Sequence, residues 1–222
     1  SQMELIEEMK PDIIVSFDLL GNDLVDGMIN DADFSAEDMT PTEDFLADIT
    51  RAVDRLAATE ATVFVATLPS PTNLPFFHAK RARLASEGLT ENAPIVFAAI
   101  DEGVIAGNAR LKEQAALHDN IHVIDLDAQV KEWAAKGIQI GDETLWIRQY
   151  GGLVGLDGLH FTDTAYALIA NLFIDTMEEV LQVEIPRIDL VAVWAQDRER
   201  PDVLLEAGFD TSLCEDFSST EF

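Results

Sequence analysis

Cysteine and basic residues are scarce in this sequence. Cys214 is the only cysteine, which excludes an intramolecular disulfide framework and a metal site made of several thiolates. Lysine and arginine together number 14 against 42 aspartates and glutamates, so the formal net charge is −28 at pH 7. A surface this acidic repels phosphate backbones and anionic lipid head groups. The composition therefore argues against nucleic acid as a partner and favours a strongly solvated surface.

Long apolar runs are also missing. No stretch approaches the roughly 20 apolar residues that a membrane-spanning helix needs, so no transmembrane segment is predicted. The first residues, Ser1-Gln2-Met3-Glu4, do not begin with methionine, and we interpret them as an interior stretch of a longer chain. Hydrophobic residues make up 48% of the 222 residues, which is enough for the core of one sizeable α/β domain or two small ones.

Apolar, β-branched runs alternate with segments of helical periodicity along the chain. Strands are expected at residues 12–17, 61–68 and 121–126. Helices are expected at residues 3–9, 40–56, 80–84, 101–117, 128–136 and 162–181. Thr40 is the expected cap of the second of these helices. Apolar runs without polar alternation are typical of strands buried on both faces. The alternation predicts a parallel sheet covered by helices, and ligands bind such sheets at the carboxyl ends of the strands.

A tripeptide of turn-forming residues, Gly21-Asn22-Asp23, follows the first expected strand. The side-chain amide of Asn22 can point its N–H donors at the mouth of the sheet, and acyl transfer needs donors where negative charge develops. Glycine, asparagine and aspartate are also the commonest residues of turns. Taken alone, the tripeptide therefore favours a plain turn.

A second motif, Asp157-Gly158-Leu159-His160, stands just before the clearest helix of the sequence. A histidine three residues after an aspartate on a turn can have one ring nitrogen held by that carboxylate, which leaves the other nitrogen free to act as a general base. The alternative is that Asp157 only forms the turn and that His160 packs beside the start of the helix.

The two motifs occur in an order and at a separation that resemble those of the SGNH (GDSL-like) hydrolases. Residues Lys10–Asp23 resemble the third conserved block of that family, and Gly151–Tyr166 resemble its last block. Thr67–Pro69, which closes the second expected strand, is similar to the family as well. The resemblance covers roughly Pro11–Met177, which is most of the chain.

This resemblance implies a flavodoxin-like fold, a three-layer α/β/α sandwich with a parallel sheet, and the hydrolysis of carboxylic esters by a lipase-like acylhydrolase. It implies that Asn22 is an oxyanion-hole donor, that His160 is the general base of a Ser-His-Asp triad and that Asp157 orients His160. The partner is then a small-molecule ester, with neither a metal nor an organic cofactor. Relatives are often exported, so the resemblance also implies a secreted or extracytoplasmic protein.

One departure from the family is large. Its nucleophilic serine lies in an N-terminal Gly-Asp-Ser block, and the sequence contains no such tripeptide. The only serines before Asn22 are Ser1 and Ser16, and neither stands in that context. We therefore expect an N-terminally incomplete hydrolase domain at residues 1–186, with its first strand or strands and its serine upstream of the chain, followed by a C-terminal extension at residues 187–222.

Two alternatives remain open at this point. Ser70 follows the second expected strand and is an alternative nucleophile, but Pro69-Ser70-Pro71 is a stiff loop without the sharp glycine turn that exposes a nucleophilic hydroxyl. The alternative function is a non-catalytic ligand-binding module that has kept the fold and lost the serine. A Gly-Asp-Ser block in the upstream coding sequence distinguishes the enzyme from the binding module.

Overall fold

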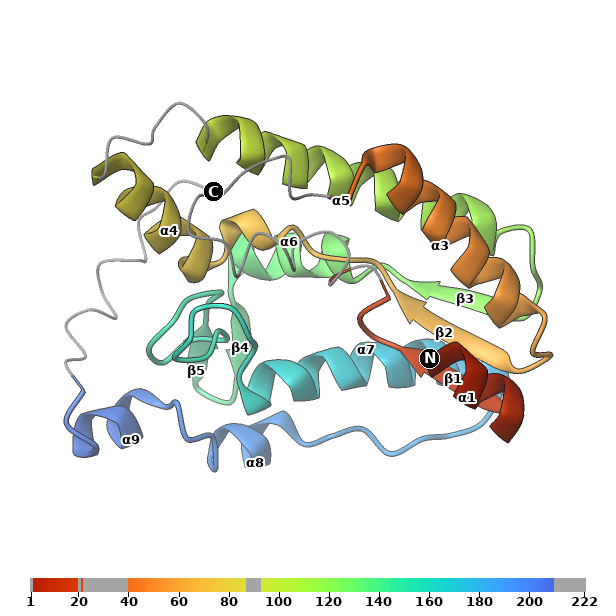
Figure 1. The fold of residues 1–222 in the computed structure, drawn as a ribbon. Coiled ribbons are helices and arrows are strands. Elements are labelled where there is room, and N and C mark those ends of the chain that lie inside the picture. The colour runs from red at the N-terminus through yellow and green to blue at the C-terminus, as the bar shows by residue number, and fades with distance from the viewer. Residues whose placement is uncertain (1, 20, 22–39, 87–92, 210–222) are drawn as a thin grey trace. The chain divides into compact units, whose positions relative to one another are not determined.

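The computed structural model describes residues 2–19, 21, 40–86 and 93–209. The chain divides into two compact units. Figure 1 labels the helices and strands. Unit 1 comprises Ser1–Ser70 and Glu87–Asp127, and unit 2 comprises Pro71–Ser86 and Ala128–Phe222. The expected division into residues 1–186 and 187–222 stays a prediction.

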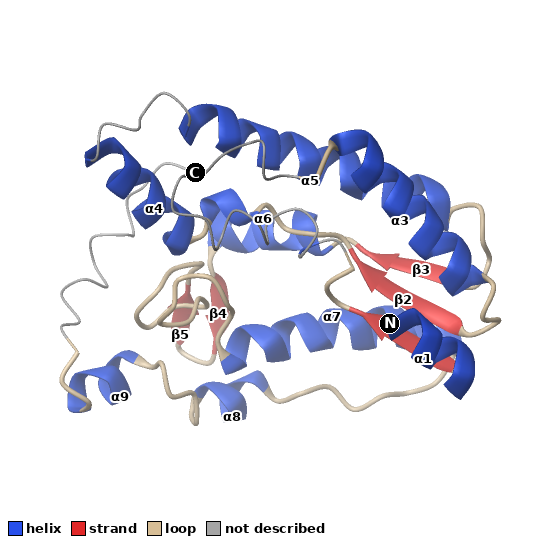
Figure 2. Ribbon diagram, in the orientation of Figure 1, coloured by secondary structure: helices blue, strands red, loops and turns tan. Residues whose placement is uncertain are grey.

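Unit 1 is built on a parallel sheet of buried apolar strands. Within the described residues the sheet has three strands, which lie side by side in chain order (Figure 2): β1 (Ile13–Ser16), β2 (Thr62–Ala66) and β3 (Ile121–Ile124). Val63 of β2 is opposite Ile14 on one side and Ile121 on the other. The mixed α/β class with a parallel sheet, which the alternation of strands and helices predicts, is confirmed.

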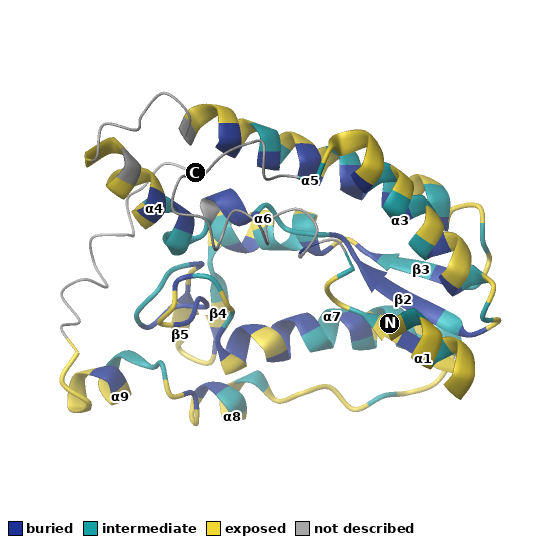
Figure 3. Ribbon diagram, in the orientation of Figure 1, coloured by how far each residue is buried: buried dark blue, intermediate teal, exposed yellow. Residues whose placement is uncertain are grey.

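Burial differs between the central strand and β1. The central strand β2 is buried on both faces, as Figure 3 shows, and strands pair with both of its edges. The expectation that β1 is buried in the same way is wrong, since Ile13 is 41% and Val15 is 55% exposed. Among the described residues β1 pairs with β2 alone, so its other flank and one of its faces lack covering side chains.

Two long helices of unit 1 pack along each other (Figure 1). The helices of this unit are α1 (Gln2–Met9), α3 (Thr42–Ala57) and α5 (Ala93–Ala115). Gly107 lets α3 and α5 approach closely, because a Cβ there would lie 2.8 Å from Cε1 of Phe45. The prediction that Thr40 caps this helix is wrong. Helix α3 begins at Thr42, and the cap position is occupied by Pro41, which has no side-chain acceptor.

Unit 2 combines helices with a short antiparallel hairpin. Its elements are η2 (Pro71–Asn73), α4 (Pro75–Ser86), β4 (Ile138–Ile140), β5 (Glu143–Leu145), α7 (Asp163–Leu181), α8 (Leu190–Trp194) and α9 (Pro201–Glu206). A further helix, α6 (Leu126–Lys136), starts in unit 1 and continues into unit 2. Of the helices in the described ranges, none combines the length and the apolar character needed to cross a membrane.

Helix α7 agrees most closely with the sequence pattern. Thr162 caps it by accepting the N–H of Ala165 on its hydroxyl oxygen at 3.4 Å. The chain after α7 returns along the helix, because the side-chain amide of Asn171 accepts the N–H of Ile188 at 2.9 Å and donates to its carbonyl at 3.0 Å. Helix α8 then packs against α7 and β4. The described residues after α7, 182–209, are called the C-terminal segment here. Through Ile188 and α8 this segment is attached to the helix that follows the aspartate–histidine motif.

Candidate active site

The Asp157–His160 motif forms the tip of a small hairpin-like loop before α7. The N–H of Gly155 donates to the carbonyl of His160 at 2.7 Å, and the N–H of Thr162 donates to the carbonyl of Leu153 at 3.1 Å. Val154 and Phe161 form an antiparallel bridge between these two hydrogen bonds. The loop therefore has a closed backbone, so that its side chains project from a defined turn.

Gly158 is required at the centre of this turn. Its φ of +74° lies in the left-handed region, which side chains with a Cβ rarely adopt. A Cβ at this position would also lie 2.9 Å from the backbone nitrogen of Phe76. The carbonyl of Gly158 accepts the N–H of Phe76 at 2.9 Å, which attaches the tip of the loop to the start of α4.

Both oxygens of the Asp157 carboxylate are used within the motif. Oδ1 accepts the backbone N–H groups of Leu159 and His160, each at 2.9 Å. Oδ2 lies 2.6 Å from Nδ1 of the His160 ring. Two backbone bonds thus fix the carboxylate, and the carboxylate in turn holds one ring nitrogen of the histidine. The structure brings together the two residues that the motif predicts as a pair.

The electrostatics of Asp157 follow from these contacts. Partial burial raises its pKa, but the hydrogen bonds from the His160 ring and from the backbone N–H groups lower it by more, so that the pKa lies below the ordinary aspartate value. The His160 side chain is 69% exposed, and its Nε2 has no hydrogen-bond partner among the described residues. This nitrogen is therefore available to take or give a proton.

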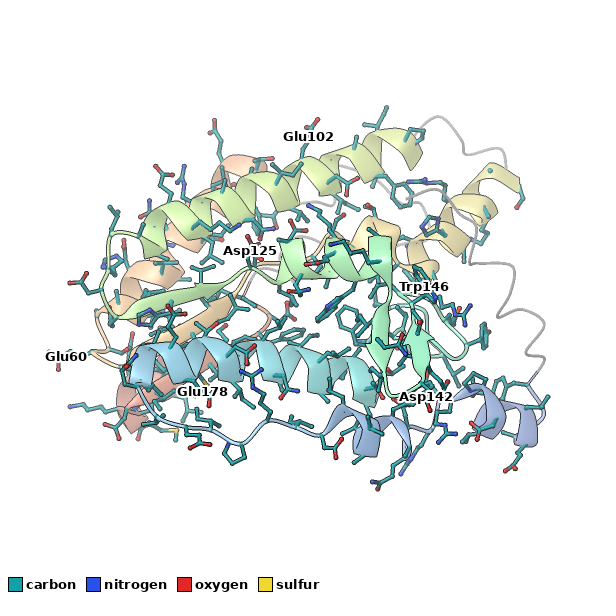
Figure 4. The ribbon with its side chains drawn as sticks, turned by 180° about the vertical axis from the view of Figure 1, so that it is seen from behind. Glu60, Glu102, Asp125, Asp142, Trp146 and Glu178 are labelled. Atoms are coloured by element: carbon teal, nitrogen blue, oxygen red, sulfur yellow. The ribbon has the colours of Figure 1, made fainter. Side chains whose placement is uncertain are left out.

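A second turn, at residues 146–153, precedes the loop. Trp146, which follows β5 and is labelled in Figure 4, accepts the N–H groups of Arg148 and Leu153 on its carbonyl oxygen at 2.8 and 2.9 Å. A Cβ on Gly152 would lie 2.3 Å from the carbonyl oxygen of Arg148, so the turn requires glycine there. The glycine-rich stretch before the motif thus serves close backbone packing.

Two acidic residues of the C-terminal segment also belong to this region. Asp197 is 2% exposed, and its Oδ2 accepts the N–H of Thr164 at 2.9 Å and the hydroxyl of Thr164 at 2.5 Å. The carboxylate of Glu199 interacts with the backbone N–H of Leu156, directly before Asp157. Sequence reasoning missed both residues, because the stretch that carries them has no motif and no periodicity.

Glu199 has an unusual electrostatic environment. Burial raises its pKa above the ordinary glutamate value, against the opposing effect of the Leu156 N–H. The negative charges of neighbouring carboxylates raise the pKa further, namely those of Asp197, Asp157 and Asp163. Its Oε2 is buried, and no hydrogen-bond partner for it is found in the part of the chain that the structure describes.

The other predicted site residues lie elsewhere in the chain. Asn22 lies outside the described residues. Its neighbour Gly21 donates its N–H to Oδ1 of Asp18 at 3.0 Å. Ser70, the alternative nucleophile, belongs to unit 1, whereas Asp157 and His160 belong to unit 2. The hydroxyl of Ser70 donates to Oδ1 of Asp101.

Polar side chains also gather where β2 and β3 end in unit 1. The amide of Asn108, on α5, accepts the N–H of Leu68 and donates to its carbonyl, both at 2.8 Å. The hydroxyl of Thr67 accepts the N–H of Asp127 at 3.0 Å and donates to Oδ1 of Asp125 at 3.2 Å. Figure 4 shows Asp125 at the point where β3 ends and α6 begins. These groups hold the strand ends and the start of α6 in place.

No group of three or more histidine, cysteine or carboxylate side chains in the described ranges is arranged to hold a metal ion. No protein-family model matches the chain, and no curated protein matches its sequence. The chemistry of the site is therefore argued from its own residues.

Proposed function

We propose that this chain carries the histidine and aspartate of a Ser-His-Asp triad in a carboxylic-ester hydrolase with a flavodoxin-like α/β/α sandwich. The observation that carries the proposal is the 2.6 Å contact between Oδ2 of Asp157 and Nδ1 of His160, on a loop whose other ring nitrogen is exposed. Because the carboxylate accepts from Nδ1, it favours the tautomer in which Nε2 is the base.

In the proposed reaction His160 takes the proton of a serine hydroxyl on Nε2 while the serine oxygen attacks the ester carbonyl. Asp157 stabilises the positive charge that the ring then carries. The amide of Asn22 donates to the oxyanion of the tetrahedral intermediate. His160 gives its proton to the leaving alcohol, and water then attacks the acyl-serine by the same sequence of proton transfers. These steps need neither a metal nor an organic cofactor.

The nucleophile in this proposal is a serine upstream of Ser1. The exposure of β1 supports it, because within the described ranges this strand pairs with β2 alone and leaves Val15 half exposed, which leaves room for a further strand. Unpaired edges of this kind also invite association between chains. The 222 residues alone are therefore expected to hydrolyse no ester and to self-associate.

The test compares this chain with the protein that includes its upstream segment. Hydrolysis of a short-chain aryl ester and covalent reaction with a fluorophosphonate are measured on both, together with size-exclusion chromatography. We expect activity, labelling of an upstream serine and a monomeric profile only when the upstream segment is present. Labelling of Ser70 in the chain alone would transfer the nucleophile to that residue. A longer protein that neither hydrolyses esters nor reacts with the probe is the outcome that favours the binding module.

The role of Asn22 is tested in the same assay. Replacement of Asn22 by alanine is expected to lower kcat by about 10²-fold with little change in KM, because an oxyanion donor acts mainly on the transition state. An unchanged kcat would reduce the tripeptide Gly21-Asn22-Asp23 to an ordinary turn.

A further inference from the structure

Glu199, in the C-terminal part of the described chain, lies beside the Asp157–His160 loop. A Cβ built on Gly155 would lie 3.3 Å from Oε1 of Glu199 and 3.7 Å from Oδ1 of Asp157. The backbone N–H of Leu156 also acts on the Glu199 carboxylate, where it lowers the pKa. The carbonyl of Leu156 accepts the side-chain amide of Gln149. The carboxylates of Glu199 and Asp157 therefore approach the same point of the loop backbone.

Glu199 is itself held in place by a buried carboxylate. Oδ1 of Asp197 accepts the N–H of Glu199 at 3.0 Å, while Oδ2 binds the backbone and the hydroxyl of Thr164 in the first turn of α7. Close packing follows directly afterwards, since a Cβ on Gly151 would lie 2.5 Å from Cγ of Pro201. Residues 197–201 thus connect the start of α7 to the loop that precedes it.

The charge of Glu199 is costly to the fold in this position. One of its oxygens is buried without a hydrogen-bond partner among the described residues, and the carboxylates around it repel it. A carboxylate that only needed to accept the Leu156 N–H could be replaced by a neutral side chain. The same negative charge lies beside Asp157, where it favours a positive imidazole ring during proton transfer.

We propose that Glu199 is a positioning residue for the Asp157–His160 pair, which it supports through the backbone of Leu156 and through its negative charge. The C-terminal segment then belongs to the machinery of the proposed esterase. The inference rests on the proposed function for its catalytic meaning, but the positioning itself can be measured in the absence of any reaction.

Three substitutions separate the contributions. Glu199→Ala removes both the acceptor and the charge, whereas Glu199→Gln keeps an acceptor oxygen for the Leu156 N–H and removes only the charge. The matched control is Glu206→Gln, because Glu206 is an exposed glutamate of α9. Because the pKa of Glu199 is raised in the fold, its ionised form destabilises the native state at neutral pH. Glu199→Gln is therefore expected to melt no lower than the unchanged protein.

The readout that does not depend on hydrolysis is the tautomer of the His160 ring, measured by long-range ¹H–¹⁵N correlation on the protein with its upstream segment. The signals of His160 are identified by their loss in His160→Ala. We expect Glu199→Ala to shift the ring from the Nδ1-protonated tautomer towards the Nε2-protonated one, and Glu206→Gln to leave it unchanged. In Glu199→Gln the tautomer is kept, but one step is lost from the pH dependence of the ring signals, because Glu199 no longer titrates.

The kinetic readout uses the protein with its upstream segment. Glu199→Ala is expected to lower kcat about tenfold with KM unchanged, and Glu199→Gln to recover part of that loss. If the unchanged protein hydrolyses no ester, the proposed function fails, while the ring signals still decide the role of Glu199. If Glu199→Ala does not fold, the pH dependence of the ring in Glu199→Gln decides it. Ring signals identical to those of the Glu206→Gln control in every folded Glu199 variant would overturn the proposal.

Discussion

Polar residues at the ends of β2 and β3 and polar residues on the Asp157–His160 loop are used in different ways. In unit 1 the side-chain amide of Asn108 accepts the N–H of Leu68 and donates to its carbonyl. The hydroxyl of Thr67 accepts the N–H of Asp127 at the start of α6. In unit 2 the carboxylate of Asp157 is equally well bonded, but it leaves Nε2 of His160 exposed and without a described partner.

The difference is that one set of polar groups is fully hydrogen-bonded within the fold, whereas the other leaves a ring nitrogen exposed. The carboxyl ends of parallel strands are the usual place for a ligand, yet the described polar groups there close on the backbone and stabilise the fold. In the loop, the Asp157 carboxylate holds Nδ1 of the His160 ring, whereas Nε2 stays exposed. A rigid support together with one unused proton acceptor is the feature that general-base chemistry needs.

The largest effect is expected on the rate of hydrolysis when the His160 ring is removed. In the protein with its upstream segment, His160→Ala is expected to lower the rate of ester hydrolysis by at least about 10³-fold, because the members of a triad act as a unit. The Tm should stay unchanged, since the side chain is mostly exposed. Both are measured on the same preparation. Retention of more than about a tenth of the rate would contradict the general-base assignment.

Removing the hydrogen-bonded amide of Asn108 should lower the free energy of unfolding instead of the reaction rate. Asn108 is 6% exposed, and Asn108→Ala leaves the N–H and carbonyl of Leu68 without their partner. We expect a loss of about 3 kcal/mol in the free energy of unfolding, measured by denaturant titration. The control is Glu102→Ala on the same helix, because the Glu102 side chain is exposed and projects outward (Figure 4). The expected change for this variant is below about 0.5 kcal/mol. Equal losses in both variants would mean that the Asn108 bonds contribute little.

The charge of Asp157 should make the stability of the fold depend on pH. The pKa of Asp157 is lowered in the fold, so its ionised form stabilises the native state at every pH above the unfolded value of about 3.9. That contribution is lost as the pH falls from this value through the folded pKa. The expected gain is small because half of the side chain is exposed. In thermal unfolding, Asp157→Asn should therefore be slightly less stable than the unchanged protein at pH 6, and the difference should vanish in strong acid. A difference that is constant across this range would exclude a role for the charge.

The smallest effect is expected at Ser70. Ser70→Ala removes one hydrogen bond to Asp101, for which a loss below about 1 kcal/mol is typical. Hydrolysis and fluorophosphonate labelling should not change. Loss of labelling would instead make the end of β2 a reactive region and would reverse the comparison between the two regions.

Local patterns account for the elements that were predicted well. The apolar periodicity predicts a helix at residues 162–181 and α7 spans Asp163–Leu181, because this signal repeats with every turn of one helix. The hairpin of β4 and β5 was missed although Gly141-Asp142 separates two short alternating runs, since three-residue strands fall below the length at which alternation is informative. The weak amphipathic pattern of α4 explains why only residues 80–84 were expected there instead of Pro75–Ser86.

Tertiary contacts decided what the sequence pattern could not. The exposure of β1 depends on which strands flank it, and an apolar run looks the same at an edge and in the middle of a sheet. Asp197 and Glu199 reach Thr164 and Leu156 across more than thirty residues of chain, so no local spacing announces them. By itself the sequence determined the acidic surface, the alternation of strands and helices, and the pairing of Asp157 with His160, because charge, periodicity and a three-residue spacing are local properties. Only the tertiary structure decided how far the described side chains of β1 are exposed and which distant carboxylates lie beside the histidine loop, because both depend on segments that meet in space after the chain has folded.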